Sequence, residues 1–287
     1  MGSERPRHAV AVAVATASLA LLAGGPGAPA AAAEAWWVPL GLRGQAVTAV
    51  VPAGPGLLAV AGGRAHCVAL PGGPRAPACT RTLGHPAGGN GPQWSLRDGR
   101  VIDERPGGGS RSDPGSPDLG SGARLLAAPA ALPGAVVAVA ADGTVWRRAR
   151  AGGWARSLLL LPAGLLAGPP AVTGVAAFDS SAITTAVYLA TDGYAVLVST
   201  DGGDDWFRAA PGLPSGVLDI TTDGPARAVY AGTRDGVWVH HLQGLPAPPA
   251  YAQQALLARW LGIAALSLVT IVAALAALGV LARRAAA

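Results

Sequence analysis

Lysine is missing from this sequence of 287 residues, and charged residues of all kinds make up only 13% of it. A long disordered polyampholyte is excluded, because charge is sparse and 51% of the residues are apolar. Glycine is abundant, at 41 residues, but has no period of three, which excludes a collagen-like chain. Long apolar runs occur only at the two ends, which argues against a multi-pass transporter.

The basic residues are all arginine, and they are scattered rather than clustered. Residues 36–258 hold 16 Arg against 14 acidic residues, so the bulk of the chain contributes only +2 to the total net charge of +5. No basic stripe is present. The sequence therefore does not predict nucleic-acid binding.

Cysteine is almost absent, with only Cys67 and Cys79, twelve positions apart. In an oxidising compartment the pair is expected to form a disulfide, which contributes about 3 kcal/mol in the chain-entropy model. The alternative is two unpaired buried thiols. A zinc site is less favoured, because no partner ligands occur nearby at zinc spacing.

The N-terminal residues 1–35 have the features of a secretory signal peptide. Arg5 and Arg7 form a positive start, residues 9–23 are apolar, and A-x-A-like cleavage sites end at Ala33 or Ala35. The apolar stretch reaches only about 22 Å as a helix, short of the ~30 Å hydrocarbon core of a bilayer. An uncleaved signal anchor is the alternative.

The C-terminus predicts a transmembrane helix over residues 259–282. Trp260 to Ala282 carries no charge and spans about 34 Å as a helix. Arg283 and Arg284 follow, so the positive-inside rule assigns residues 283–287 to the cytoplasm. Residues 246–258 read as a Pro-rich stalk. The alternative, an apolar helix buried in a soluble protein, is disfavoured by the terminal position. We expect a single-pass protein of the cell membrane with residues 36–245 outside the cytoplasm.

The middle of the chain, residues 36–245, predicts an all-β fold. Short apolar runs are cut by Gly, Pro and Asp, and similar Asp-Gly turns recur with spacings of 44, 50 and 43. These turns are Asp98-Gly99, Asp142-Gly143, Asp192-Gly193 and Asp235-Gly236, with a fainter copy at Ala61–Arg64. A period of about 40–50 residues matches a β-propeller blade, so we predict a propeller-like domain of about five short blades. A β-sandwich is the alternative. The low-complexity stretch 105–122 is expected to be a mobile loop or a linker.

One short motif has family-level character. Ser199-Thr-Asp-Gly-Gly-Asp-Asp-Trp206 resembles the Asp box, or BNR repeat, of sialidases and related β-propellers. The resemblance implies a structural hairpin turn in which Asp201 accepts backbone N–H bonds, Gly203 permits unusual backbone angles and Trp206 packs beneath. Ser199 completes the pattern. It also implies that Asp201 is peripheral and not catalytic. A calcium site at Asp201, Asp204 and Asp205 is a minor alternative.

Residues for catalysis are scarce. A sialidase-like enzyme needs an arginine cluster and a tyrosine nucleophile, and only Tyr194 is free of a repeat-strand or stalk position. Asp179 and Asp219 are the candidate carboxylates, but nothing in the sequence pairs them, and both are expected in surface turns. His240-His241 is expected to be exposed after the last strand. No phosphate loop, metalloprotease motif or nucleophile elbow occurs, so no cofactor, metal or catalytic residue is predicted.

The sequence favours a membrane-anchored, non-catalytic binding or scaffold module for a protein or a glycan. One alternative is a sialidase-like extracytoplasmic glycoside hydrolase, motivated by the Asp-box-like stretch alone. Another is a subunit whose incomplete propeller is closed by a partner. The sequence does not name the ligand.

Overall fold

The computed structural model describes most of the chain between residues 37 and 285. The described residues are 37–70, 79, 93–104, 110–113, 115–123, 125–129, 132, 134–149, 151–161, 171–181, 184–209, 212–224, 226–242 and 248–285. The predicted signal peptide, residues 1–35, and the last two residues of the predicted tail lie outside them.

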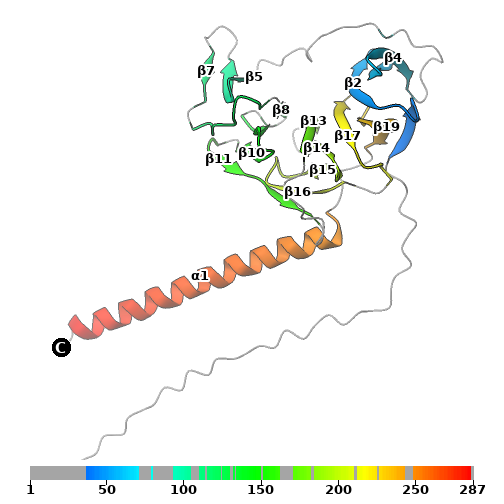
Figure 1. The fold of residues 1–287 in the computed structure, drawn as a ribbon. Coiled ribbons are helices and arrows are strands. Elements are labelled where there is room, and N and C mark those ends of the chain that lie inside the picture. The colour runs from blue at the N-terminus through cyan, green and yellow to red at the C-terminus, as the bar shows by residue number, and fades with distance from the viewer. Residues whose placement is uncertain are drawn as a thin grey trace, which may run out of the picture. The chain divides into compact units, whose positions relative to one another are not determined.

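The prediction of an all-β, propeller-like fold with one C-terminal helix is confirmed. Within the described residues the strands form five sheets (Figure 1). The first sheet consists of β2 (Val47–Ala53), β3 (Gly56–Ala61) and β4 (Arg64–Ala69). The second consists of β5 (Gln93–Arg97), β6 (Arg100–Glu104) and β7 (Arg111–Ser112). The third consists of β8 (Leu125–Ala127), β9 (Val136–Val139), β10 (Val145–Arg148) and β11 (Trp154–Arg156).

The last two sheets each contain a strand from elsewhere in the chain. The fourth sheet consists of β13 (Ala171–Ser181), β14 (Thr184–Asp192), β15 (Ala195–Ser199) and β16 (Asp205–Arg208), with β12 (Leu158–Leu160) running parallel to β16 at the edge. The fifth consists of β17 (Val217–Asp223), β18 (Ala228–Thr233) and β19 (Gly236–His241), completed by β1 (Val38–Gly41). The first strand of the described chain therefore belongs to the last sheet.

Apolar side chains fill the spaces between neighbouring sheets. The buried side chains form four clusters, and each cluster contains residues from two sheets. One residue from each of the two sheets identifies each cluster: Leu57 and Tyr230, Tyr188 and Ile220, Val137 and Trp206, and Val101 and Val136. The sheets are thus neighbours in the order first, fifth, fourth, third, second. Strands β2, β17, β13 and β8 lie side by side across these junctions. The described residues do not close the sheets into a ring.

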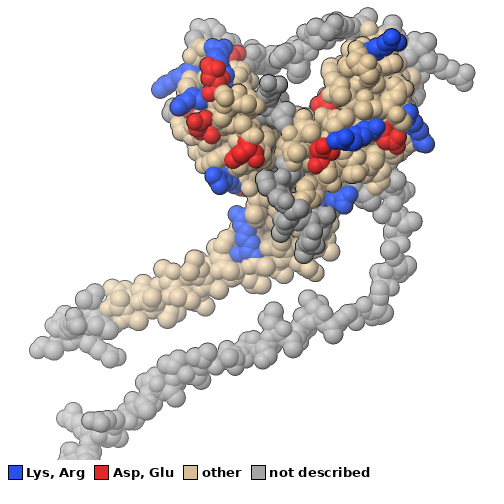
Figure 2. Space-filling view, viewed as in Figure 1, with Lys and Arg blue, Asp and Glu red and all other residues tan. Residues whose placement is uncertain are grey.

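Helix α1 (Ala250–Ala285) follows the last sheet. Pro248 and Pro249 precede it, and the N–H groups of Ala252 and Gln253 donate to the carbonyl of Pro249, which starts the helix. Ala250–Leu278 is long and apolar enough to cross a membrane. In Figure 2 the coloured part of the helix shows no charged side chain on this face except near its beginning. The helix begins earlier than expected, so the last nine residues of the predicted stalk, 250–258, are helical.

The expected mobile loop at residues 105–122 is not what the structure has where this stretch is described. Residues 105–109 lie outside the described residues, but Arg111–Ser112 form β7 beside β6. Leu119 is buried, and its backbone bonds to both Gly99 and Ala141. The sequence did not predict this ordered structure, because Leu119 is the single large apolar residue in a stretch that is otherwise rich in Gly, Ser and Pro.

Candidate functional site

The hairpin turn between β15 and β16 is held by bonds among its own residues. The hydroxyl of Ser199 donates to Oδ1 of Asp201 over 2.6 Å and accepts the N–H of Gly203 over 2.8 Å. Oδ1 of Asp201 also accepts the N–H groups of Asp204 and Asp205, at 3.0 and 3.2 Å. The carboxylate of Asp201 is therefore occupied by hydrogen bonds within the turn.

Gly203 and Trp206 lie at the base of the turn. Gly203 has φ +99°, and a Cβ on it would lie 2.7 Å from a methyl group of Val137 in the neighbouring sheet. The buried indole of Trp206 donates its Nε1–H to the carbonyl of Gly203 over 3.1 Å. Both residues thus hold the turn against the junction between the third and fourth sheets. At position 203 only glycine fits.

The two remaining carboxylates of the turn point to other elements. Asp204 pairs with Arg147 on β10. Asp205 accepts a bond over 2.8 Å from the guanidinium of Arg259 on α1, and its side chain is only 15% exposed. The turn therefore joins the fourth sheet both to the third sheet and to the helix.

Burial of Asp205 raises the pKa of its carboxyl group, and the nearby carboxylates of Asp201 and Asp204 add to this shift. The Arg259 guanidinium opposes the shift by stabilising the ionised form. Asp204 and Asp205 thus depend on arginines for part of their charge compensation. The described residues contain no group of three or more side chains suited to a metal ion, so the calcium alternative finds no support there.

The first turns of α1 pack against the same region. The hydroxyl of Tyr251 accepts the backbone N–H of Arg208 at the end of β16, over 3.0 Å. Ala252 is buried in the core between the fourth and fifth sheets, and Leu256 packs against that core. The helix therefore has both polar and apolar contacts with the β domain before its long uncharged run begins.

The repeated Asp-Gly turns all connect hairpin strands. They lie between β5 and β6, β9 and β10, β14 and β15, and β18 and β19, and each second residue, Gly99, Gly143, Gly193 and Gly236, has positive φ. The corresponding turn of the first sheet, between β3 and β4, has Gly62 and Gly63 at positive φ. Asp98 itself adopts φ 51°. Local turn chemistry thus explains these positions.

Three of the four turn aspartates also make side-chain contacts. Asp142 accepts the N–H of Thr144 within its own turn. Asp192 pairs with Arg234 of the fifth sheet at 2.7 Å, and Asp235 accepts the N–H of Gly44 over 2.9 Å. The last two link neighbouring segments, so these residues are structural in the described fold.

Asp219 differs from its expected place in a surface turn. It lies within β17, where it is mostly buried, and its Oδ2 accepts the backbone N–H of Val50 on β2 over 2.8 Å. Burial raises the pKa of this carboxyl group, while hydrogen bonds from the N–H groups of Val50 and Ile220 counteract the shift. Asp219 thus joins the fifth sheet to the first. The side chain of Asp179 lies outside the described residues.

The arrangement that a sialidase-like enzyme requires is not formed by the described residues. Among the strands that lie at the junctions between sheets, β2, β17, β13, β8 and β5, only β5 contains an arginine, Arg97. Tyr194 lies in a hairpin turn, where its N–H donates to Thr191. Tyr188 is fully buried, and burial raises the pKa of its hydroxyl group, which disfavours a phenolate nucleophile. The described residues therefore do not support the hydrolase alternative.

Sequence reasoning missed a polar cluster between the second and third sheets. Asp113 is buried, and its Oδ2 accepts bonds from Nε of Arg148 over 3.0 Å and Nε1 of Trp154 over 2.6 Å. The Arg148 guanidinium also lies 5.2 Å from the ring centre of Trp94. The cluster holds the residues after β7 against β10 and β11. No spacing rule connects these four residues, so the sequence carried no signal for it.

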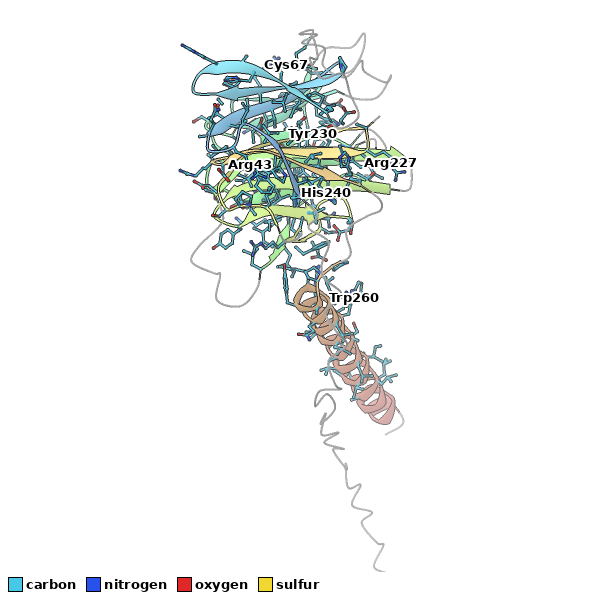
Figure 3. The ribbon with its side chains drawn as sticks, turned by 90° about the vertical axis from the view of Figure 1, so that its right-hand side faces the viewer. Arg43, Cys67, Arg227, Tyr230, His240 and Trp260 are labelled. Carbon is cyan, nitrogen blue, oxygen red and sulfur yellow. A yellow bond between two sulfur atoms is a disulfide. The ribbon has the colours of Figure 1, made fainter. Side chains whose placement is uncertain are left out.

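Two further expectations concern the first and last sheets. A disulfide links Cys67 on β4 to Cys79; Figure 3 labels Cys67 on the first sheet. His240 and His241, expected after the last strand, lie within β19. The ring of His240 is 5.6 Å from that of the buried Trp37, because β1 brings Trp37 alongside β19.

No family model and no curated protein matches this sequence. Among solved structures, U3-55K superposes with a TM-score of 0.34 at 16% identity, covering 51% of this chain and 50% of that chain. PorZ, a surface component of the type-IX secretion system of Porphyromonas gingivalis, gives 0.31 at 12% identity, covering 75% and 39%. YCF48 from Cyanidioschyzon merolae gives 0.30 at 11% identity, covering 68% and 66%.

This chain spans about half the length of the first solved structures that it matches.

Proposed function

We propose that this protein is a single-pass membrane protein whose propeller-like domain lies outside the cytoplasm and binds a protein or a glycan without catalysis. The observation that carries the proposal is the direct attachment of a β domain to an apolar helix of membrane-spanning length. Such a domain offers loops and sheet edges for recognition and is held at a membrane.

The orientation rests on the two ends and on the cysteines. A disulfide between Cys67 and Cys79 suits an oxidising compartment, and Arg283 with Arg284 suits the cytoplasmic end of the helix. The signal-peptide features of residues 1–35 agree with export. The Asp-box interpretation of residues 199–206 is supported by the turn bonds of Ser199 and Asp201, and it makes this turn architectural.

Topology is tested with single added cysteines in the intact chain. A membrane-impermeant maleimide applied to intact cells should label Ser121→Cys, which is exposed in the β domain, and should not label Ala286→Cys in the tail. After permeabilisation both positions should be labelled. Labelling of the tail alone in intact cells would show that the protein has the opposite orientation and would contradict the proposal.

Binding is tested by purifying the full-length protein from gently solubilised native membranes and identifying what co-purifies. The expected result is a protein or glycan in stoichiometric amount whose binding is reproduced with purified components. A glycan-hydrolysis screen tests for the opposite outcome, which is enzymatic turnover of a glycan. Turnover that is abolished by Asp219→Asn, in a variant with an unchanged melting temperature, would overturn the non-catalytic proposal.

A further inference from the structure

Four residues from three elements are connected beside the start of the apolar run of α1. Arg259 precedes Trp260, the first residue of the uncharged run, and is paired with Asp205 at the beginning of β16. Leu158 of β12 lies opposite Asp205 in the parallel pairing of the two strands, and its N–H donates to the carbonyl of Asp204. Leu158, Asp205 and Arg259 are thus neighbours in turn, and Trp260 follows Arg259 on the helix.

The direction of β16 relative to α1 follows from two contacts. Asp205 contacts Arg259, and Arg208 contacts Tyr251, so the strand and the helix run antiparallel. Eight residues of helix advance about 12 Å, and three residues of strand advance about 10 Å, so the two contacts are mutually consistent. The Asp205 end of β16 is therefore the end nearer to the uncharged run.

The length of the helix indicates where the bilayer begins. The apolar segment Ala250–Leu278 has 29 residues, which correspond to about 43 Å, more than the ~30 Å hydrocarbon core requires. Its first ten residues hold the contacts with the β domain, which are made by Tyr251, Ala252, Leu256 and Arg259. The uncharged run from Trp260 onward is sufficient to span the bilayer.

The side chains of these four residues suit the interface between water and lipid. Trp260 is 67% exposed and Leu158 is 43% exposed, although both are large and apolar. Indole rings favour the headgroup level of a bilayer. The charge of Arg259 at this level is compensated by Asp205, which lowers the cost of placing the guanidinium beside lipid. Figure 3 labels Trp260 near the beginning of the helix.

We infer that Leu158, Asp205, Arg259 and Trp260 form a membrane-contacting surface, which places the edge of the fourth sheet in the phospholipid headgroup layer. The partner of this surface is the leaflet that faces the β domain. The inference rests on the membrane anchoring contained in the proposed function. It adds that the β domain does not hang from a loose tether but touches the bilayer at a defined edge.

The test places a polarity-insensitive fluorophore on single added cysteines of the full chain in phosphatidylcholine nanodiscs. Nitroxide lipids, labelled at the headgroup or along the acyl chain, act as quenchers. Leu158→Cys should lose most of its fluorescence to headgroup nitroxide. Val51→Cys is the matched control, because Val51 is 48% exposed but lies on β2 in the first sheet, and it should keep its fluorescence. Both sites are exposed, so labels there leave the core intact.

A third labelled position distinguishes a failure of the membrane-contacting surface from a failure of the membrane anchoring. Leu268→Cys, in the middle of the apolar run, should be quenched by acyl-chain nitroxide. If position 268 is quenched while position 158 behaves like position 51, the membrane-contacting surface is wrong and the anchoring stands. If position 268 is not quenched, the anchoring is wrong and the surface falls with it.

Discussion

Val38 lies opposite Val239 in an antiparallel pair, so the first strand of the described chain closes the sheet formed by the last three strands. About two hundred residues separate the two valines in the sequence. The pairing buries the neighbouring Trp37 in the core between the fourth and fifth sheets. The two ends of the β domain are thus joined by backbone hydrogen bonds and by one large side chain.

This closure predicts a strong effect of Trp37→Ala. Trp37 is 1% exposed, and removal of a buried tryptophan costs about 3–5 kcal/mol of unfolding free energy. Val38→Ala is the matched control, because Val38 is 52% exposed and should change stability by less than about 0.5 kcal/mol. Denaturant unfolding of the detergent-solubilised chain, followed by circular dichroism, measures both. Equal effects of the two variants would show that β1 does not contribute to the core.

The turn before β16 predicts that Gly203→Ala is more destabilising than Gly193→Ala. Both glycines have positive φ, so both variants incur backbone strain of about 1–3 kcal/mol. Only Gly203 has a neighbour in the way, since its added Cβ would meet Val137 at 2.7 Å, which adds about 1–3 kcal/mol. Thermal unfolding of the two variants isolates the packing contribution. Similar melting temperatures would contradict the close approach of the third and fourth sheets.

Asp219 predicts a pH dependence of stability with a defined sign. Its pKa in the folded protein is raised above the ordinary value of 3.8, so the folded protein binds this proton more tightly than the unfolded chain. Its contribution to the unfolding free energy therefore increases as pH falls through the folded pKa, and becomes constant below the ordinary value. Asp219→Asn should remove this component from the pH profile between neutral and mildly acidic pH. An unchanged profile would contradict the burial of the carboxyl group.

Two substitutions of Asp219 separate the effect of its charge on stability from the effect of its hydrogen bond. The amide oxygen of Asp219→Asn still accepts the N–H of Val50, whereas Asp219→Ala leaves that donor without its partner. The alanine variant should therefore be less stable than the asparagine variant by about 1–3 kcal/mol at neutral pH. Urea unfolding at fixed pH compares them directly. Equal stabilities would mean that the bond between the first and fifth sheets contributes nothing.

The cluster at Asp113 predicts a larger effect than a surface ion pair of the same type. Asp113→Ala removes the acceptor of Arg148 and Trp154 in a buried place and should cost about 3–5 kcal/mol. Arg97→Ala removes the partner of Glu104 at a side chain that is 62% exposed, and should cost less than about 1 kcal/mol. Limited proteolysis between β7 and β8 should accelerate for the first variant alone. An unchanged rate of proteolysis in Asp113→Ala would contradict the role of the cluster in ordering residues 110–113 and 115–123.

Local features of the sequence were sufficient for several parts of the structure. The Asp-Gly turns could be placed because a turn of this kind depends on two adjacent residues and on the positive φ that glycine adopts without strain. The apolar helix could be placed because composition over some twenty residues is enough to identify it. The start of the helix was missed, because Ala250–Ala258 lies next to prolines and its contacts with the β domain are not visible in composition.

By itself, then, the sequence determined the hairpins, their recurrence along the chain and the apolar helix, because each depends on neighbouring residues. Only the tertiary structure decided which sheets are neighbours and what joins them. Arg259 and Asp205 are 54 residues apart, and Asp219 and Val50 are 169 apart. Such pairs have no characteristic spacing, since they form only after separate sheets have packed and buried the surfaces between them. The position of Asp219 on β17, the order within residues 110–123 and the pairing of β1 with β19 all arise in this way.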